Sequence, residues 1–424
     1  MSGVGSFGKG VVEKVLMRKG VEVAEFRYDL RAARVVGKVA VADPEQLPIG
    51  TFGLDGRLTR PLFEKWISAR AVPFARAGRV ASRFGFGTSE ELMLSTLGLS
   101  LSDQYWFRPA AADVDWESVN PYDNVFDTTL GQALILMDGD SASRAIAVID
   151  RDPTVIQSSP DAACGGNLPK YWCIDDRGVR RLCKSGKAAN GIMEPYNEVV
   201  ATRLCSMILG EGDYVPSEFV PSTGFPKVFS SCPCMVDSST ELIPAHSVMA
   251  LAPHDNELSL YQRFVSVCER HGVAGAAASL EKMMVVDHIL SNFDRHCSNF
   301  GVLRDADTNE WLRVAPLFDM GESLWCDRMQ TLDLRPHRFG YSMPFRHNPS
   351  SQLEAYCRDL GWFDPSLLDG FIDYALETAE MNPFARVSPG FLDLLRRGLG
   401  ATVAQATDRA TAVRRKAFPA RRAR

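Results

Sequence analysis

The feature that most constrains the fold is an apolar helix pattern that ends in a cluster of polar residues. The segment SLEKMMVVDHILSNF, residues 279–293, runs directly into DRHCSN, residues 294–299. Two short apolar runs follow, FGVLRD and EWLRVAPLFD, and the polar turn between them predicts a hairpin. Asp294 and Asp319 flank this hairpin, so the arrangement can bring both carboxylates to the same end of the structure.

Two carboxylates with a nearby side-chain amide suit phosphoryl transfer. One acid orients or deprotonates the attacking hydroxyl, and the other binds a magnesium ion that bridges the phosphates. The amide oxygen of Asn299 is a hard ligand that can complete the metal shell. Taken alone, Asp294 is more simply interpreted as a polar residue at a helix end, so the hypothesis depends on the whole set.

A glycine-containing stretch upstream fits the same chemistry. The segment SSPDAACGGNLPKYW carries Gly165, Gly166 and Lys170 and predicts a loop that precedes a strand. Glycines let backbone amides approach a phosphate, and a lysine adds a positive charge.

A lysine and a glutamate follow this loop along the chain. Lys184 directly follows the strand-like run RRLC, which favours it over Lys187 and Lys170 as the phosphate-binding lysine of a strand. Glu198 lies in EPYNEVVATRL, which has the apolar spacing of a helix.

The motif DRHCSN followed by PLFDMG resembles the catalytic loop and metal-binding segment of the HipA-like serine/threonine kinases. Through the pattern D-R-H-x-x-N it is also similar to the phosphatidylinositol 3/4-kinase branch of the protein-kinase-like fold. The resemblance implies that Asp294 is the catalytic aspartate and that Asn299 and Asp319 are magnesium ligands. It covers roughly residues 140–400.

The resemblance also implies roles for the upstream residues. Gly165, Gly166 and Lys170 match the glycine-rich loop that covers the phosphates of ATP, although two adjacent glycines replace a G-x-G-x-x-G series. Lys184 matches the strand lysine that holds the phosphates, and Glu198 matches its helical partner.

In HipA toxins a serine of the glycine-rich loop can be self-phosphorylated. Ser158 and Ser159 are the nearest serines in this chain. Within the catalytic loop, His296 is expected to support the loop through hydrogen bonds, and Asp287 is expected to be structural. Arg295 can be a brace of the loop or a phosphate contact, and the sequence does not decide between them.

The expected fold class is α+β, a two-lobed protein-kinase-like (HipA-like) fold with a small β-rich N-lobe and a mainly helical C-lobe. Residues 1–135 are interpreted as an N-terminal α/β module that resembles a HipA-like subgroup associated with phage and mobile elements. The remaining domains are expected to be the small lobe with its nucleotide-binding elements at 136–255, the helical large lobe with the catalytic loop at 256–406, and a basic tail at 407–424.

Local patterns predict the elements within these domains. Strands are expected within 11–43 and at RAIAVID (144–150), PKYWCID (169–175) and GVRRLCKSG (178–186), and a turn is expected around Tyr105 and Trp106. Helices are expected before Pro73, which interrupts the pattern, after a cap at Thr88, over 193–210, and through most of the chain beyond residue 258.

Composition limits the remaining possibilities. The 424 residues have a net charge of -5, which argues against a general nucleic-acid binder, and the ten cysteines lack paired CxxC spacings. The absence of a long apolar run or a signal-peptide pattern predicts a cytoplasmic protein without a membrane partner. The tail from Thr407 onward carries seven basic residues, read either as a solvated helix end or as a contact for an acidic partner or nucleic acid. At the other end, GVGSFG (residues 3–8) is expected to be a flexible terminus.

These observations predict an ATP- and Mg²⁺-dependent protein serine/threonine kinase that transfers the γ-phosphoryl group to a protein hydroxyl, with self-phosphorylation and an antitoxin-like partner as further expectations. One alternative is a pseudokinase-like, nucleotide-binding regulator. Another is a kinase that acts on a lipid or a small molecule.

Overall fold

The computed structural model describes most of the chain, namely residues 10–135, 140–220, 228–252, 257–333, 344–386 and 388–417. The segment GVGSFG and the last basic residues, Arg421, Arg422 and Arg424, lie outside these ranges. The chain divides into two compact units. The first comprises Met1–Cys183, Cys234–Leu242 and Arg304–Asn309, and the second comprises Lys184–Pro233, Ile243–Leu303 and Glu310–Arg424. The domain boundaries expected at residues 135, 255 and 406 remain predictions.

The first unit begins with a four-stranded sheet in the order β3-β2-β1-β4. The strands expected within residues 11–43 are confirmed, and this segment forms β1 (Val11–Arg18), β2 (Val21–Asp29) and β3 (Arg34–Val41), with β2 antiparallel to both β1 and β3. The turn expected around Tyr105 and Trp106 is wrong, because these residues begin β4 (Tyr105–Pro109), which pairs antiparallel with β1. Both side chains are buried. Pairing with β1 and burial of the two aromatic rings therefore stabilise a strand where the local sequence favours a turn.

One core of this unit lies between the sheet and two helices. Phe26 of β2 contacts Phe63 of α1 (Arg60–Arg70), with ring centroids 5.1 Å apart in an edge-on arrangement. Met93 and Leu94 of α3 (Ser89–Ser95) join the same cluster. The predicted cap of α3 is confirmed, because the hydroxyl of Thr88 accepts a hydrogen bond from the backbone N–H of Glu91.

A second core lies among α2 (Phe74–Phe84), α5 (Thr129–Ile135) and α6 (Asp140–Arg151). The strand predicted at RAIAVID is wrong, because this segment lies within α6. Ala145 and Ile149 are four residues apart and both buried, whereas Val148 is exposed. This pattern has the period of a helix face, which a short run of β-branched residues concealed.

The chain then leads from these cores to two strands, the second of which ends at Lys184. The predicted strands are confirmed as β5 (Lys170–Ile174) and β6 (Arg180–Lys184), which are neighbours in a sheet. The remaining elements are short helices and 3₁₀ turns: η1 (Pro44–Gln46), α4 (Trp116–Val119), η2 (Pro153–Ile156) and η3 (Pro160–Ala163).

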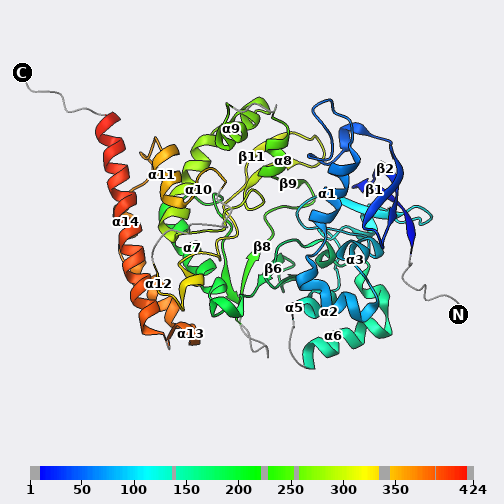
Figure 1. Ribbon diagram of the computed structural model, residues 1–424, viewed down its shortest axis with the longest axis horizontal. Helices are drawn as coiled ribbons and strands as arrows, with labels where there is room; N and C mark the ends of the chain where they lie inside the picture. Colours follow the sequence, from blue (N-terminus) through cyan, green and yellow to red (C-terminus); the bar gives the residue numbers. More distant parts are fainter. Residues whose placement is uncertain are drawn as a thin grey trace, which may run out of the picture. The chain divides into compact units, whose positions relative to one another are not determined.

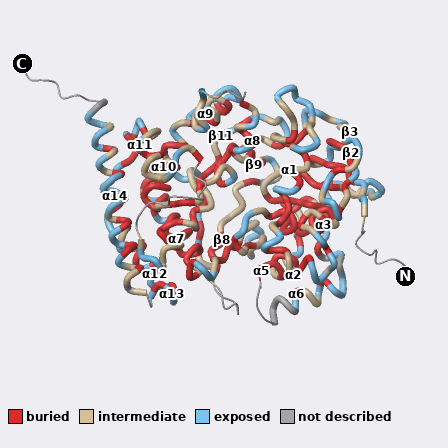
Figure 2. Tube along the Cα trace, in the orientation of Figure 1, coloured by how far each residue is buried: buried red, intermediate tan, exposed pale blue. Residues whose placement is uncertain are grey.

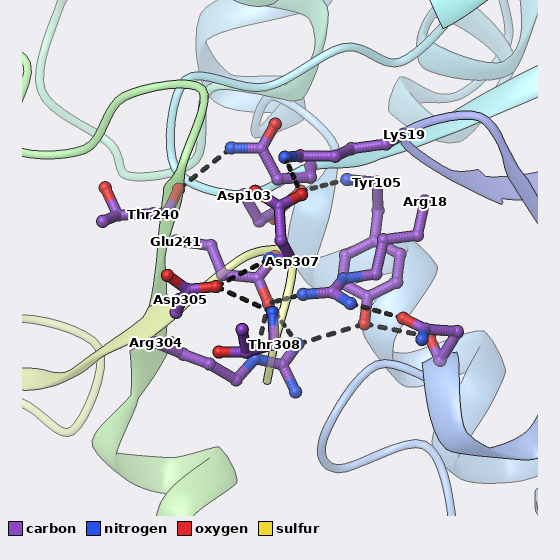
Figure 3. A network of polar contacts seen from close by, with 12 residues as sticks. Arg18, Lys19, Asp103, Tyr105, Thr240, Glu241, Arg304, Asp305, Asp307 and Thr308 are labelled. Atoms are coloured by element: carbon purple, nitrogen blue, oxygen red, sulfur yellow. Dashed lines mark hydrogen bonds and ion pairs between the residues drawn. The ribbon is translucent and has the colours of Figure 1, made fainter. Parts of the chain in front are cut away.

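Buried charges join β1 to the two later segments of this unit (Figure 3). Nη2 of Arg18 lies 2.9 Å from Oε1 of Glu241, and Nε of Arg304 lies 2.6 Å from the same oxygen. All three side chains are at most 7% exposed. Beside them, Lys19 and Asp307 form an ion pair at 2.5 Å that is more exposed.

The second unit is mainly helical. Its helices are α7 (Glu194–Ile208), α8 (Ala245–Ala250), α9 (Leu260–Arg270), α10 (Ala276–Leu290), α11 (Pro349–Tyr356), α12 (Phe371–Glu380), α13 (Pro383–Arg386) and α14 (Pro389–Ala417), with the 3₁₀ turns η4 (Ala188–Asn190), η5 (Cys326–Arg328) and η6 (Pro365–Leu368). The helices expected over 193–210 and beyond residue 258 are thus confirmed. Within the described ranges, no helix combines the length and the apolar character needed to cross a bilayer.

Helix α10 packs against α7, α11 and α14 of this unit (Figure 1). Its residues from Met283 to Leu290 are all buried, and Figure 2 shows this helix largely in red. A helix that is apolar all round must lie inside a domain. The rigid core therefore extends to the start of the polar loop at residue 291.

Short strands account for the remaining elements of the chain. The expected hairpin is confirmed as β10 (Gly301–Asp305) and β11 (Trp311–Val314), in a sheet of order β11-β10-β9 with β9 (Thr240–Pro244). Strands β7 (Glu218–Val220) and β8 (Phe229–Pro233) pair antiparallel. The observed fold is mixed α/β, while its division into kinase lobes remains a prediction.

Candidate active site

The loop after α10 is held in a fixed conformation by its own polar residues. Helix α10 ends at Ser291, which adopts a left-handed conformation with φ 51°. The side chain of Asn292 then donates to Oδ1 of Asp287 at 2.8 Å and accepts from the backbone N–H of Asp294 at 3.1 Å. The loop thus turns back on the end of the helix, which positions Asp294.

Arg295 is the brace of this loop. Its guanidinium is fully buried and pairs with the buried carboxylate of Asp287, with Nη2 and Oδ1 3.0 Å apart. Nη1 donates to the carbonyl of Asn299 at 2.7 Å and to that of Phe318 at 2.6 Å. One side chain therefore links α10, the loop and the residue that precedes Asp319. Of the two roles left open by the sequence, the structure supports the brace.

Lys184, at the end of β6, contacts two carboxylates. Its Nζ lies 2.8 Å from Oε1 of Glu198 on α7 and 2.9 Å from Oδ1 of Asp319. Burial alone would lower the pKa of Lys184, but the charges of Asp319 and Glu198 outweigh burial and hold this pKa well above its ordinary value. The lysine is therefore protonated at neutral pH. Lys187 pairs instead with Glu322.

The segment that carries Asp319 is fixed from α7. Oε2 of Glu198 accepts a hydrogen bond from the backbone N–H of Met320 at 3.4 Å, and the amide of Asn197 donates to the carbonyls of Gly321 and Ser323. Asp319 itself has φ 56°, a left-handed conformation that costs a non-glycine residue free energy. Such backbone strain is concentrated at functional sites in proteins.

Asp294 lies in an acidic environment. Burial, followed by the charges of Glu322 and Asp319, raises the pKa of Asp294 to about 7, although Lys187 and Arg295 oppose this shift. One third of the side chain is exposed. A carboxyl group with such a pKa can take up a proton near neutral pH, as a general base must.

Asn299 and His296 complete the loop. Nδ2 of Asn299 donates to the backbone carbonyl of Asp294 at 2.9 Å, which leaves the amide oxygen as the group that can bind a metal. The ring of His296 accepts from the backbone N–H of Ser298 at 3.2 Å and lies 3.9 Å from the carboxylate of Asp294. The loop contact of His296 agrees with its expected supporting role.

Two further residues of this site were not assigned by the sequence. Lys187 forms an ion pair with Glu322, three residues after Asp319, and its charge also acts on Asp294. Glu194, one turn before Glu198 on α7, accepts from the backbone N–H of Lys187 and is fully buried. In the sequence, Lys187 is an alternative to Lys184 as the phosphate-binding lysine. Glu194 and Glu198 are four residues apart, which places both on one face of the helix. Their partners are remote in sequence, so no local signal indicated the contacts.

The glycine loop belongs to the first unit. Gly166 adopts φ +84°, and a Cβ at this position would lie 2.4 Å from Nζ of Lys170. The positive φ favours glycine at this position, and Lys170 places its ammonium group beside the loop. Gly165 lies beside it, with open space on most sides.

The two candidate serines differ in exposure. Ser159 is fully buried and caps η3, because its hydroxyl accepts from the backbone N–H of Asp161. Ser158 is partly exposed. Modification of Ser159 would require η3 to open, whereas Ser158 is accessible without such a change.

The donor atoms near Asp319 suit magnesium better than a transition metal. Among the residues that the structure describes, no three His, Cys, Asp or Glu side chains are grouped as a metal site. Magnesium is commonly held by one or two protein oxygens together with water and substrate phosphates. A carboxylate from Asp319 and an amide oxygen from Asn299 fit that requirement.

Comparison with known proteins gives a short similarity to one class of enzyme, the serine/threonine-protein kinases. The relative is CtkA of Helicobacter pylori, which is 46% identical over 43 residues, or 10% of this chain and 13% of the relative. The match thus spans about an eighth of that protein's length. No protein-family model matches the chain. A crystal structure of the Helicobacter pylori proinflammatory kinase CtkA, 19% identical, covers 58% of this chain and 95% of its own with a TM-score of 0.43.

Proposed function

We propose that this chain is an ATP- and Mg²⁺-dependent protein serine/threonine kinase of the HipA-like type. The observation that carries the proposal is the pairing of Lys184 with both Glu198 and Asp319. In protein kinases, a lysine paired with a helical glutamate and a metal-binding aspartate must both be in place for phosphoryl transfer. The short similarity to a serine/threonine-protein kinase supports the same class.

Each residue has a defined role in this proposal. Lys184 binds the phosphates of ATP, and Glu198 orients Lys184. Asp294 orients the acceptor hydroxyl and accepts its proton, for which a pKa of about 7 is suitable. Gly165, Gly166 and Lys170 are proposed to contribute backbone amides and a charge that bind phosphate.

Asn299 and Asp319 would hold the magnesium ion. The bound ion neutralises charge on the phosphates and so favours transfer. The protein's own contribution is to fix the two oxygen ligands. Glu198 and Asn197 hold the segment of Asp319, and Arg295 holds the carbonyl of Asn299.

The acceptor is proposed to be a serine or threonine of a protein. A lipid or small-molecule acceptor, an antitoxin-like partner and a cytoplasmic location remain predictions. For self-phosphorylation we favour Ser158 over Ser159, because Ser159 is buried and caps η3.

The test is incubation of the purified protein with ATP and Mg²⁺, followed by intact-mass and peptide mass spectrometry. Asp294→Asn and Asp319→Asn should each lower transfer by about 100-fold or more, the range expected for loss of a general base or a metal ligand. Asp373→Asn is the matched control, because Asp373 is 73% exposed on α12 and pairs with Arg396 at the surface. It should transfer phosphate like the wild type.

The results also separate the alternatives. If the wild type binds ATP, as a thermal shift would show, but neither hydrolyses it nor gains phosphate, the protein is a nucleotide-binding regulator. If it hydrolyses ATP and modifies no protein, the acceptor is of another class. Absence of ATP binding would contradict the kinase proposal.

A further inference from the structure

The guanidinium group of Arg76 on α2 donates hydrogen bonds to backbone carbonyls of the glycine loop. Its Nη1 donates to the carbonyls of Cys164 at 2.8 Å and Gly166 at 3.0 Å, with a longer contact of 3.4 Å to Gly165. Its Nη2 donates to the carbonyl of Lys170 at 2.7 Å. One side chain thus holds carbonyls at both ends of the loop, and all of these residues lie within the first unit.

The arginine is buried, whereas the tip of the loop is open. Arg76 is 6% exposed, while Gly166 and Asn167 are exposed. A buried guanidinium is costly unless it is hydrogen-bonded, and the four carbonyls supply acceptors for Arg76. The buried carboxyl group of Asp161 lies near enough for the charge of Arg76 to oppose the rise in the pKa of Asp161 that burial causes. The loop is therefore fixed at its base by a charged group that solvent does not reach.

The backbone amides of the loop remain available. Within the described ranges, no backbone carbonyl accepts a hydrogen bond from the N–H groups of Gly165, Gly166 and Asn167. Nζ of Lys170 lies beside Gly166, at 2.4 Å from the position of an added Cβ. Consecutive unpaired amides with an adjacent ammonium group form an anion-binding concavity. Because Arg76 occupies the carbonyls, the polar groups left for a ligand are donors.

We infer that Arg76 is a positioning residue for the glycine loop, which it holds in a conformation that can bind phosphate. The inference rests on the proposed function, since the anion is taken to be the phosphate chain of ATP. Arg76 touches no part of the nucleotide in this role. It acts by holding the carbonyls of the loop, which keeps the amides ready to bind phosphate.

Lysine cannot replace arginine fully at this position. The planar guanidinium presents donors in a fixed fork, whereas an ammonium group is a compact point charge. Lysine can keep the charge near Asp161 and bind one or two of the carbonyls. A graded loss from arginine to lysine to alanine is therefore a signature of the proposed role.

The test compares ATP with adenosine, which lacks phosphates. In Arg76→Ala, the Kd for ATP and the KM for ATP should each rise by about 10- to 100-fold, since several hydrogen bonds to a charged group are lost. The Kd for adenosine and kcat at saturating ATP should stay within about threefold of the wild type, because the residue acts only through the phosphates. Arg76→Lys should restore part of the ATP affinity.

Arg83 provides the matched control, because it lies on the same helix and pairs with Asp150 at the surface, where it is 61% exposed. Arg83→Ala should change neither constant. Equal loss of ATP and adenosine affinity in Arg76→Ala, or no loss of either, would overturn the inference. If Arg76→Ala does not fold, Arg76→Lys decides in the same way. A wild type that does not bind ATP would instead contradict the proposed function.

Discussion

Lys184 forms ion pairs with two carboxylates of the candidate site, those of Glu198 and Asp319. Replacement by methionine leaves Glu198, which is 3% exposed, without its counter-charge. Removal of one partner from a buried ion pair costs about 3–5 kcal/mol. We therefore expect Lys184→Met to be strongly destabilised in urea unfolding and inactive in phosphoryl transfer. The double variant Lys184→Met/Glu198→Gln should regain much of the stability but none of the activity. Equal instability of the two variants would contradict this account.

Asp161 predicts a pH dependence of stability. Burial raises the pKa of Asp161 to about 7 in the folded protein, against about 3.9 for an unfolded aspartate. Between these values the folded state binds more protons than the unfolded state, so this residue's contribution to stability falls as pH rises from about 4 to about 7. Asp161→Asn keeps an acceptor for the backbone N–H of Trp172 and removes the titration.

The measurement is the free energy of unfolding of both proteins at pH 5 and pH 8. The variant should lose less stability than the wild type over this interval, by a few kcal/mol at most. Parallel pH profiles would show that Asp161 does not titrate in this range. Other buried acids, including Glu194, whose burial raises its pKa to about 7, contribute equally to both proteins.

Among the elements, α10 and the loop that follows it behave as one structural piece. Asp287 pairs with Arg295, and both are fully buried. Asp287→Asn should lower the free energy of unfolding by about 3–5 kcal/mol, because Arg295 then carries a buried, unpaired charge. It should also lower kcat, because Arg295 holds the carbonyls on both sides of the site.

The same helix offers the control. Lys282 pairs with Asp213, and both side chains are about one third exposed. An exposed ion pair contributes roughly 0–1 kcal/mol, so Lys282→Met should be nearly neutral. If both variants lose a similar free energy of unfolding, the loss in Asp287→Asn does not come from the buried ion pair with Arg295.

The elements differ in how well the sequence predicts them. The helix from 276 and the strands around Lys184 were predictable because their apolar patterns are local. Segment 144–150 was misassigned to a strand because its β-branched residues hide a four-residue spacing that only packing against α5 makes evident. Tyr105 and Trp106 were misassigned to a turn because their partner strand lies almost 90 residues earlier.

Contacts between remote segments set the limit of prediction for the whole molecule. DRHCSN and FDMG could be recognised as motifs, because each is contiguous. By contrast, Lys187 and Glu322 are 135 residues apart, and Arg76 and Lys170 are 94 apart, so no local pattern reveals these pairs. The groups that support the site are therefore harder to predict than its proposed central residues.

The buried charges around Glu241 make the sharpest prediction at this scale. Arg18 and Arg304 both bind Glu241, although Arg18 is 223 residues away from it in sequence (Figure 3). Glu241→Gln leaves two buried guanidinium groups without a counter-charge, so we expect a loss of about 3–5 kcal/mol in the free energy of unfolding. Since the three residues come from separate segments, β1 and the segments 234–242 and 304–309 should lose protection from hydrogen exchange together.

Asp307→Asn is the control for this variant. Asp307 is 64% exposed in its ion pair with Lys19, so its loss should cost less than about 1 kcal/mol. Loss of protection confined to residues 234–242 in Glu241→Gln would show that the charges stabilise only their own strand. Joint loss would show that the N-terminal sheet and these later segments fold as one cooperative unit, because a single carboxylate then holds segments from three parts of the chain.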